Sequence, residues 1–377
     1  MATGPGATRG SGRSTGAGHA ARARVLFVGD FAASRRGNFS VSERLAELLG
    51  DEGFGVATTS SLLSSPLRAL DMVRSAVAER GRVDVAVIDV YSGRAFMWAE
   101  WTASVLAAAK VPLVLVLRGG NLPRFAAAEP ERVSRLFAKA TVVVALSDFL
   151  REALAPYRAD CVVVPNPLDA GAYPFRLRER LEPRLVWLRA FHEIYNPPLG
   201  PRALAELTSA LPDATLTMIG SDKGDGSLAR TLAAAADLGV ASRLKTPGPV
   251  DKAAVPAALD AADVFLNTTN VDNVPISVLE AMACGLCVVS TDVGGIPYLA
   301  TDGHDALLVP PDDPVAMAQA VTRLFREPGL AARLSANARE RALANDWSAV
   351  LPRWTALLDD VAHARPLRGR ARGGRAS

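Results

Sequence analysis

The segment Asn267–Gly295 reads NTTNVDNVPISVLEAMACGLCVVSTDVGG and joins a polar loop to an apolar helical stretch. The pattern predicts a strand that ends near Asn267, a helix that begins close to Ser277, and a second strand that ends in Gly294 and Gly295. A loop that leads into a helix presents free backbone N–H groups and the positive end of the helix dipole. The segment therefore favours binding of phosphate or sugar oxygens at the helix start.

Two acidic residues stand eight positions apart in this segment, Asp272 in the predicted loop and Glu280 inside the predicted helix. In one interpretation, both carboxylates face a ligand and accept hydrogen bonds from sugar hydroxyl groups. The other interpretation makes Asp272 a turn residue and Glu280 a solvated helical residue. The spacing alone leaves both interpretations open.

Short apolar and β-branched runs alternate with helical stretches on both sides of this segment. The predicted strands are 25–29, 54–58, 84–90, 113–117, 141–145 and 161–165 in the first half, and 185–189, 215–220, 244–246, 264–267 and 286–290 in the second. Such alternation is typical of parallel sheets covered by helices. It predicts two doubly wound α/β domains that face each other across a cleft, with ligands beyond the carboxyl ends of the strands.

Composition and charge exclude several classes of protein. The 377 residues are 49% hydrophobic, so the chain can bury large cores. No apolar run approaches the roughly 20 residues that a membrane-spanning helix needs. The formal net charge is +3, but residues 1–21 and 363–377 contain two and five Arg and no acid, which leaves the body at −4. A nucleic-acid-binding domain carries its positive charge on the folded body, so nucleic acid is not expected as a partner.

Both ends of the chain are predicted to be disordered. Residues 1–21 are rich in Gly and lack the apolar segment of a signal peptide. The Arg-rich tail 363–377 is interpreted as a solvated tail, with weak attraction to anionic lipid or RNA as the alternative. Three Cys are too few for a disulfide framework and favour a cytoplasmic location. Cys284 and Cys287 are interpreted as small apolar residues rather than as a redox pair.

Several ligand-binding motifs are missing from the sequence. No G-x-G-x-x-G follows the first predicted strand, and no G-x-x-x-x-G-K-[ST] occurs. There is no D-x-D pair, and the four His are scattered at positions 19, 192, 304 and 363. We therefore expect neither a bound metal ion nor a resident cofactor.

The segment 272–295 resembles the retaining nucleotide-sugar glycosyltransferases of the GT-B type, specifically family 4. That family carries E-G-F-[GP]-x-x-x-x-E-A-M-A-x-G-x-P-V-V-A-T-x-x-G-G, and this chain has D-N-V-P-I-S-V-L-E-A-M-A-C-G-L-C-V-V-S-T-D-V-G-G. The similarity continues through 302–310 and 313–314. It implies that Glu280 binds the ribose hydroxyl groups of the donor. Asp272, which replaces the family's first Glu, is expected to contact the donor sugar.

Another part of the chain matches the family only partly. Arg189 ends a predicted strand, as the family's phosphate-binding Arg does, but residues 194–196 contain no Lys where the family has one. Lys223, one of five Lys in the chain, either supplies the second positive charge or is a solvated loop residue. Positive charge is needed at this site because a leaving nucleoside diphosphate develops negative charge. Arg, Lys and backbone N–H groups stabilise that charge.

The resemblance assigns the remaining site residues by position. Arg189, Asp272 and Glu280 are the predicted catalytic residues. The predicted donor-binding residues are Gly37, Asn38, Lys223, Gly248, Val250, Asn273, Val274, Pro275, Ile276, Ser277 and Glu280. The predicted acceptor side consists of Arg118, Gly119, Gly120 and Asn121. Arg118 stands in a region where family members often place a His, so no catalytic His is assigned.

The implied architecture is GT-B, an α/β fold of two Rossmann-like, doubly wound domains with a C-terminal helix that returns to the first domain. The predicted organisation is a disordered lead at 1–21, an N-terminal acceptor domain at 22–175, a C-terminal donor domain at 176–345, the returning helix at 346–362 and a basic tail at 363–377.

The implied function is transfer of a sugar from a nucleoside diphosphate sugar, with retention of configuration and without a metal ion. The departing phosphate would take the acceptor proton. The acceptor is a glycan, a lipid-linked molecule or a small molecule. Two alternatives remain open at this point: a nucleotide-sugar 2-epimerase of the same fold, and a non-catalytic protein that binds sugar nucleotides.

Overall fold

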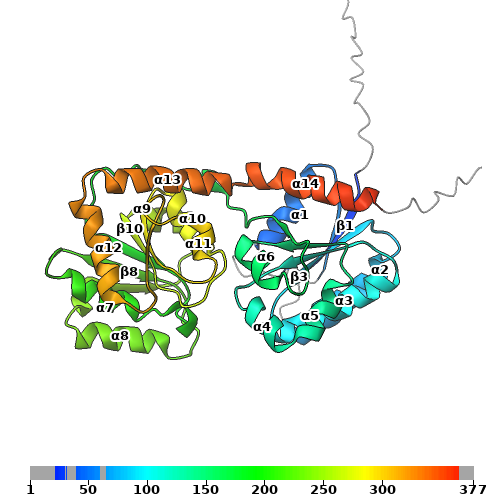
Figure 1. The fold of residues 1–377 in the computed structure, drawn as a ribbon, viewed down its shortest axis with the longest axis horizontal. Helices are drawn as coiled ribbons and strands as arrows, with labels where there is room; N and C mark the ends of the chain where they lie inside the picture. The colour runs from blue at the N-terminus through cyan, green and yellow to red at the C-terminus, as the bar shows by residue number, and fades with distance from the viewer. Residues whose placement is uncertain (1–21, 30, 32–39, 60–64, 365–377) are drawn as a thin grey trace, which may run out of the picture.

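The computed structural model describes residues 22–29, 31, 40–59 and 65–364 (Figure 1). The predictions for the lead, for the tail beyond residue 364, and for Gly37 and Asn38 lie outside these residues. None of the described helices is long and apolar enough to cross a bilayer.

The N-terminal domain is built around a parallel sheet of six described strands in the order β2-β1-β3-β4-β5-β6. The strands are β1 (Arg24–Val28), β2 (Gly55–Thr58), β3 (Val85–Val90), β4 (Leu113–Leu117), β5 (Val142–Ala145) and β6 (Val162–Val163). The helices are α1 (Val41–Asp51), α2 (Ser65–Glu79), α3 (Phe96–Ala108), α4 (Leu122–Ala128), α5 (Pro130–Phe137) and α6 (Asp148–Leu154).

The central strand β4 shows why this sequence forms a sheet that is covered on both faces. All five residues of LVLVL are buried. Leu113, Leu115 and Leu117 pack in the core beneath α2, α3 and α5, whereas Val114 and Val116 pack in the core on the opposite face. Side chains alternate along a strand, so a continuous apolar run requires helices on both sides of the sheet.

The C-terminal domain repeats this plan with the strand order β12-β11-β10-β7-β8-β9. The strands are β7 (Arg184–Leu188), β8 (Thr215–Ile219), β9 (Leu244–Gly248), β10 (Val264–Asn267), β11 (Cys287–Thr291) and β12 (Leu307–Val309). The α-helices are α7 (Leu199–Leu207), α8 (Ser227–Asp237), α9 (Val255–Asp260), α10 (Ile276–Ala283), α11 (Ile296–Leu299), α12 (Pro314–Arg326) and α13 (Leu330–Ala344). Strand β10 lies between β7 and β11, so the loops that follow β7 and β10 leave the same edge of the sheet side by side.

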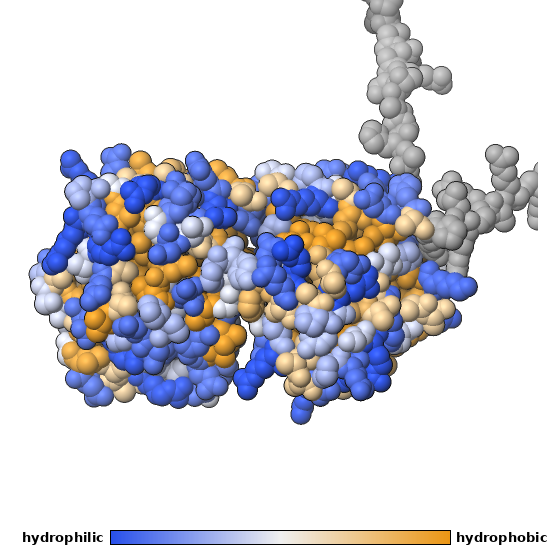
Figure 2. Space-filling view, viewed as in Figure 1, coloured by the Kyte–Doolittle hydropathy of each residue, from blue (hydrophilic) through white to orange (hydrophobic). Residues whose placement is uncertain are grey.

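The last helix, α14 (Trp347–His363), returns to the N-terminal domain, as the sequence predicts (Figure 1). Val350, Trp354, Leu358 and Val361 form its buried face and pack in the core that contains β1 and β4. Their spacing of three and four residues places them on one side of the helix. The two domains meet along a narrow seam below α13 and α14 (Figure 2).

A buried ionic cluster fixes the segment that leads into the C-terminal domain. The side chain of Arg178 is fully buried and forms ion pairs with Asp260 and with the buried Asp263. Its guanidinium also donates hydrogen bonds to the carbonyl oxygens of Cys284 and Ala262. Burial lowers the pKa of Arg178, and the carboxylates oppose this effect.

We expect Arg178→Met to lower the free energy of unfolding by about 1–3 kcal/mol, because the buried carbonyl oxygens of Cys284 and Ala262 lose the donor that Arg178 supplies, while Asp263 keeps its ion pairs with Arg176 and Arg184. Urea unfolding measures this loss. Arg180→Met is the matched control, since Arg180 is exposed two residues further on. Equal stability of the two variants would contradict the role of the cluster.

Asp346 ties the start of α14 to the connection between the domains. Its Oδ1 accepts a hydrogen bond from the backbone N–H of Ser348 (2.8 Å), and its Oδ2 accepts one from the backbone N–H of Ala170 (2.9 Å). Burial alone would raise the pKa of Asp346, but hydrogen bonds from Ser348, Ala170 and Trp347 lower it overall. The carboxylate therefore stabilises the fold at neutral pH and loses this effect as the pH falls through its lowered pKa.

Asp346→Ala should reduce the free energy of unfolding by about 1–2 kcal/mol at pH 7, because the helix loses its N-cap. The difference from the wild type should shrink in acid, where the wild-type carboxylate is protonated as well. Urea unfolding at pH 7 and at acidic pH tests both statements. Asp360→Ala, at an exposed position of the same helix, is the control, and a pH-independent difference would contradict the account.

Candidate functional site

An ion pair stands at the edge of the C-terminal sheet, where β7 and β10 end. Arg189 directly follows β7, and its guanidinium pairs with Asp272 in the loop between β10 and α10. The Cζ atom of Arg189 lies 4.4 Å from the centre of the Tyr195 ring. Burial lowers the pKa of Arg189, and Tyr195 and Glu280 oppose this effect. Its Nε is buried without a hydrogen-bond partner among the described residues, which leaves a donor for an anionic ligand.

The loop 272–275 leads directly into α10, so the backbone N–H groups of the first turn lie next to this ion pair. The Oδ1 atom of Asp272 accepts a hydrogen bond from the backbone N–H of Asn273 (2.9 Å). The buried Oγ atom of Ser277 has no hydrogen-bond partner within the described part of the chain. Free N–H groups, an unsatisfied hydroxyl and an Arg together form a site that suits phosphate oxygens.

Glu280 lies one turn inside α10, is 3% exposed, and has two partners. Its Oε1 accepts a hydrogen bond from the Tyr173 hydroxyl (2.8 Å) and pairs with the ammonium group of Lys252. Burial and the Glu280 charge raise the pKa of Tyr173, so its hydroxyl remains a donor at neutral pH. Both contacts use the same carboxylate oxygen. The solvated interpretation of Glu280 is therefore wrong, since the residue is buried in a polar network.

A pocket of about 710 Å³ opens beside this network. It is lined by Tyr173, Lys252 and Ile276 on one side, and by Ser40, the N-cap of α1, and Arg44 within α1 on the other. Its volume lies within the range of pockets that bind small molecules. Residues of both domains, including neighbours of Glu280, therefore line one pocket that is large enough for a small ligand.

The other predicted donor-binding residues differ in their positions: some lie at strand ends or against the core, and one is exposed in a loop. Gly248 ends β9, and its carbonyl accepts a hydrogen bond from the N–H of Gly220 (3.1 Å). Val250, Val274 and Ile276 are partly buried against the core that contains α10. Lys223 is exposed in the loop after β8, where its backbone N–H bonds to the carbonyl of Phe191. A phosphate-binding role for Lys223 stays a prediction.

Arg118, on the predicted acceptor side, is part of a buried cluster at the carboxyl ends of β3 and β4. Its Nε donates to Asp89 (2.6 Å), and its guanidinium also donates to Ser42 in α1 (3.0 Å). Burial alone would lower the pKa of Arg118, but Asp89 and the nearby Tyr91 raise it overall. Arg118 therefore positions the start of α1 against the sheet in addition to any contact with an acceptor.

The neighbouring glycines of the acceptor side contact the C-terminal domain. A side chain at Gly120 would lie 3.0 Å from the backbone of Asp272. The Oγ atom of Ser147, the N-cap of α6, donates a hydrogen bond to Asn273 Oδ1. Gly119 adopts a positive φ of 99°, and Asn121 is exposed. The structure thus brings Gly120 next to Asp272, as a cleft between two domains requires.

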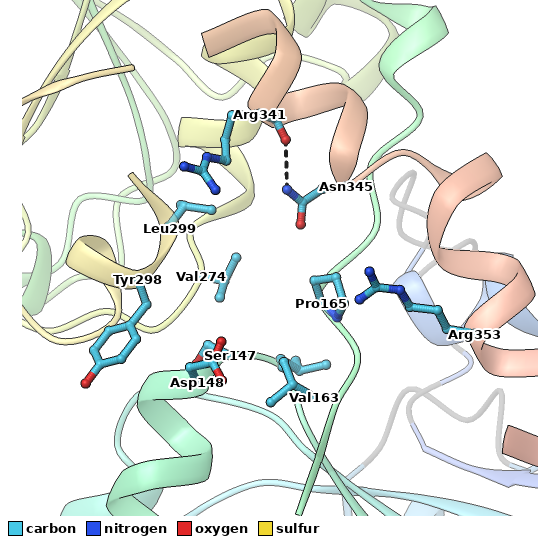
Figure 3. A pocket seen from close by; sticks show the side chains of 11 residues that line it. Ser147, Asp148, Val163, Pro165, Val274, Tyr298, Leu299, Arg341, Asn345 and Arg353 are labelled. Atoms are coloured by element: carbon cyan, nitrogen blue, oxygen red, sulfur yellow. Dashed lines mark hydrogen bonds between the residues drawn. The ribbon is translucent and has the colours of Figure 1, made fainter. Parts of the chain in front are cut away.

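A smaller cavity of about 180 Å³ lies behind the loop 272–275 (Figure 3). Ser147 and Val274 line it from the two domains, and Arg353 of α14 points toward it near Pro165. Asn345, which directly follows α13, also lines the cavity, and its side chain donates a hydrogen bond to the Arg341 carbonyl (2.9 Å). The cavity lies at the joint between the domains, separate from the pocket beside Glu280.

The sequence reasoning did not identify Tyr173, Lys252 and Asp89 as site residues. Tyr173 and Lys252 are far from Glu280 along the chain, and only the fold brings them together. Lys is rare in this sequence, but rarity alone does not distinguish Lys252 from Lys223. Asp89 ends a predicted buried strand, a position at which ligand-binding residues are common in such sheets.

Part of the chain is similar in sequence to known glycosyltransferases. Residues 182–327 match the family model described as Glycosyl transferases group 1. Over 217 residues the chain is 31% identical to phosphatidyl-myo-inositol mannosyltransferase of Mycolicibacterium smegmatis, a match that covers 55% of this chain and 54% of that protein. It is also 31% identical to D-inositol 3-phosphate glycosyltransferase of Xylanimonas cellulosilytica, covering 55% and 51%. The chain spans about half the length of these curated relatives.

Solved structures share the fold at lower sequence identity. The crystal structure of Anabaena HepE in complex with UDP aligns with a TM-score of 0.72 at 18% identity, over 89% of this chain and all of that chain. Sucrose-phosphate synthase from Thermosynechococcus elongatus aligns with a TM-score of 0.72 at 16% identity, over 91% of this chain and all of that chain. Residues 182–327 are therefore similar to the glycosyl transferases group 1 family, and the chain has the GT-B fold.

Proposed function

We propose that this protein transfers a sugar from a nucleoside diphosphate sugar to an acceptor. One observation carries the proposal: Arg189, Asp272, the start of α10 and the Glu280 network gather at the carboxyl edge of the C-terminal sheet. Each supplies the chemistry that one part of such a donor needs. The cation and N–H groups suit the diphosphate, and the carboxylates suit ribose and sugar hydroxyl groups.

In this proposal the donor lies mainly on the C-terminal domain. Glu280 binds the ribose hydroxyl groups, and the base occupies the pocket of about 710 Å³ beside it. The diphosphate reaches Arg189 and the N–H groups of α10, which places the sugar next to Asp272. Proteins with similar sequence or fold support this donor class, because one is named as GDP-mannose-dependent and HepE was solved with UDP-glucose.

Donor binding would exchange partners within the site. The diphosphate competes with Asp272 for Arg189, and the released Asp272 carboxylate becomes free to accept hydrogen bonds from the sugar. As the nucleoside diphosphate leaves, its growing negative charge is stabilised by Arg189 and the N–H groups, which are already in place. We also propose that the transfer retains the anomeric configuration and uses no metal ion. The acceptor, a glycan, a lipid-linked molecule or a small molecule, would approach over Arg118 and Gly119.

Calorimetric titration with UDP, GDP and ADP tests the ribose site. We expect one of these nucleotides to bind the wild type, and Glu280→Ala to raise its Kd about tenfold to a hundredfold, because hydrogen bonds to a charged group contribute about 1.5–3 kcal/mol. Glu340→Ala is the control, since Glu340 is exposed on α13. Urea unfolding of both variants shows whether the buried substitution leaves the fold intact. Unchanged nucleotide affinity in a folded Glu280→Ala variant would contradict the assignment.

Arg189→Gln should lower the turnover of the donor roughly a hundredfold to a thousandfold, since it removes a fixed charge that stabilises the leaving group. The measurement is release of the nucleoside diphosphate from the donor in the presence of acceptor extracts. Arg202→Gln is the control, because Arg202 also pairs with an acid, the exposed Asp312. Equal turnover of the two variants would contradict a phosphate-binding role for Arg189.

The same assay separates the two alternative functions. A wild type that binds the nucleotide and turns over no donor with any acceptor would be a sugar-nucleotide-binding protein. Release of UDP without an acceptor, together with a free sugar whose configuration at C2 is inverted, would indicate a 2-epimerase. Release that depends on the acceptor supports transfer.

A further inference from the structure

The guanidinium of Arg189 has a second partner besides its carboxylate. It pairs with Asp272, and its Cζ atom also lies over the ring of Tyr195, 4.4 Å from the ring centre. An aromatic face attracts a cation through its negative quadrupole and needs no charged group for this. The ring can therefore hold the cation while the N–H groups of Arg189 bind an anion.

Tyr195 is fixed to the ends of the two strands that form the site. It ends the short helical turn Glu193–Tyr195, and its carbonyl oxygen accepts a hydrogen bond from the Thr268 hydroxyl (2.6 Å). Thr268 directly follows β10. The indole N–H of Trp187, a buried residue of β7, donates to the same hydroxyl (2.9 Å). The backbone of Tyr195 is thus bonded to the strand end that leads to Asp272.

The residues on either side of Tyr195 are fixed as well. The carbonyl oxygen of Ile194 accepts a hydrogen bond from the backbone N–H of Asn270 (2.8 Å). Asn196 adopts a left-handed conformation with a φ of 43°, and its side-chain amide donates to Asp312 (3.1 Å). A ring whose backbone is held on both sides has little freedom, so it can set the position of the guanidinium that it contacts.

Donor binding would affect the two partners of Arg189 in different ways. The diphosphate competes with Asp272, because both are anions that need the N–H groups of the guanidinium. The ring of Tyr195 neither competes with the phosphate nor repels it. Residues 194–196 contain no Lys, so stabilisation of the leaving group at this strand end depends on Arg189.

We propose that Tyr195 is a positioning residue for Arg189, whose ring holds the guanidinium in place while the diphosphate displaces Asp272. This role rests on the proposed function, since it requires a diphosphate at Arg189. The aromatic face is the part of Tyr195 that acts. Phe should therefore replace Tyr195 without loss, whereas an aliphatic side chain should not.

The gain in affinity from the β-phosphate reports on this role. Calorimetry gives the Kd of the nucleoside diphosphate that binds best among UDP, GDP and ADP, and the Kd of the matching monophosphate. We expect the wild type to bind the diphosphate at least about tenfold more tightly, because the β-phosphate adds charge-assisted hydrogen bonds. Tyr195→Leu should reduce this preference about threefold to tenfold by weakening diphosphate binding alone, whereas Tyr195→Phe should keep it within about twofold.

Two comparisons separate this role from a structural one. In the Arg189→Gln background, Tyr195→Leu should not change the preference further, since the ring then has no cation to hold. Phe125→Leu is the matched control, because Phe125 is a partly buried ring of the N-terminal domain, 5.9 Å from the Cζ atom of Arg132. This control should leave the affinities for both nucleotides unchanged.

The outcomes distinguish failure of this role from failure of the proposed function. Absence of nucleotide binding, a wild type without preference for the diphosphate, or a preference that survives Arg189→Gln would contradict the donor site itself. A preference that Arg189→Gln abolishes and Tyr195→Leu leaves intact would overturn only the role of Tyr195. That role is also overturned if Tyr195→Leu weakens both nucleotides equally, if it acts in the Arg189→Gln background, or if Tyr195→Phe loses the preference.

Discussion

The loop Asp272–Asn273 is enclosed by backbone on two sides, and the arrangement of the site depends on this close packing. A Cβ atom at Gly294 or Gly295 would collide with the carbonyl oxygens of Asp272 and Asn273. Gly120 approaches the same loop from the N-terminal domain. Only glycine permits backbones to come this close. Since the Ser147 hydroxyl also binds Asn273, the N-terminal domain helps to set the position of the residues that we assign to the donor.

The charged groups of the site are already paired with one another. Arg189 pairs with Asp272, and Glu280 pairs with Lys252 and accepts a hydrogen bond from Tyr173. Isolated charges would be costly at this degree of burial, so the pairs keep the side chains ordered without a ligand. A ligand with both an anionic group and hydroxyl groups can replace each partner by another of the same kind. This exchange explains how buried ions can form a binding site and also remain compatible with a stable fold.

The fold could be predicted from the sequence to a large extent, because its signals are local. Continuous apolar runs such as LVLVL identify strands that are buried on both faces, and most strand ends lie within one or two residues of their predicted positions. Strand β12 was not predicted as a strand, since three residues carry little periodicity. Asp272 and Glu280 could be selected because one short motif contains both. Tyr173 and Lys252 could not, since their contact with Glu280 arises only from tertiary packing.

A crystal structure with the best-binding nucleoside diphosphate would show whether Arg189, Asp272, α10 and Glu280 form one donor site. We expect the ribose on the Glu280 carboxylate and the β-phosphate on Arg189 and the N–H groups of α10, with the pair between Arg189 and Asp272 opened. A nucleotide bound elsewhere, with this pair intact and Glu280 still held by Lys252 and Tyr173 alone, would contradict it.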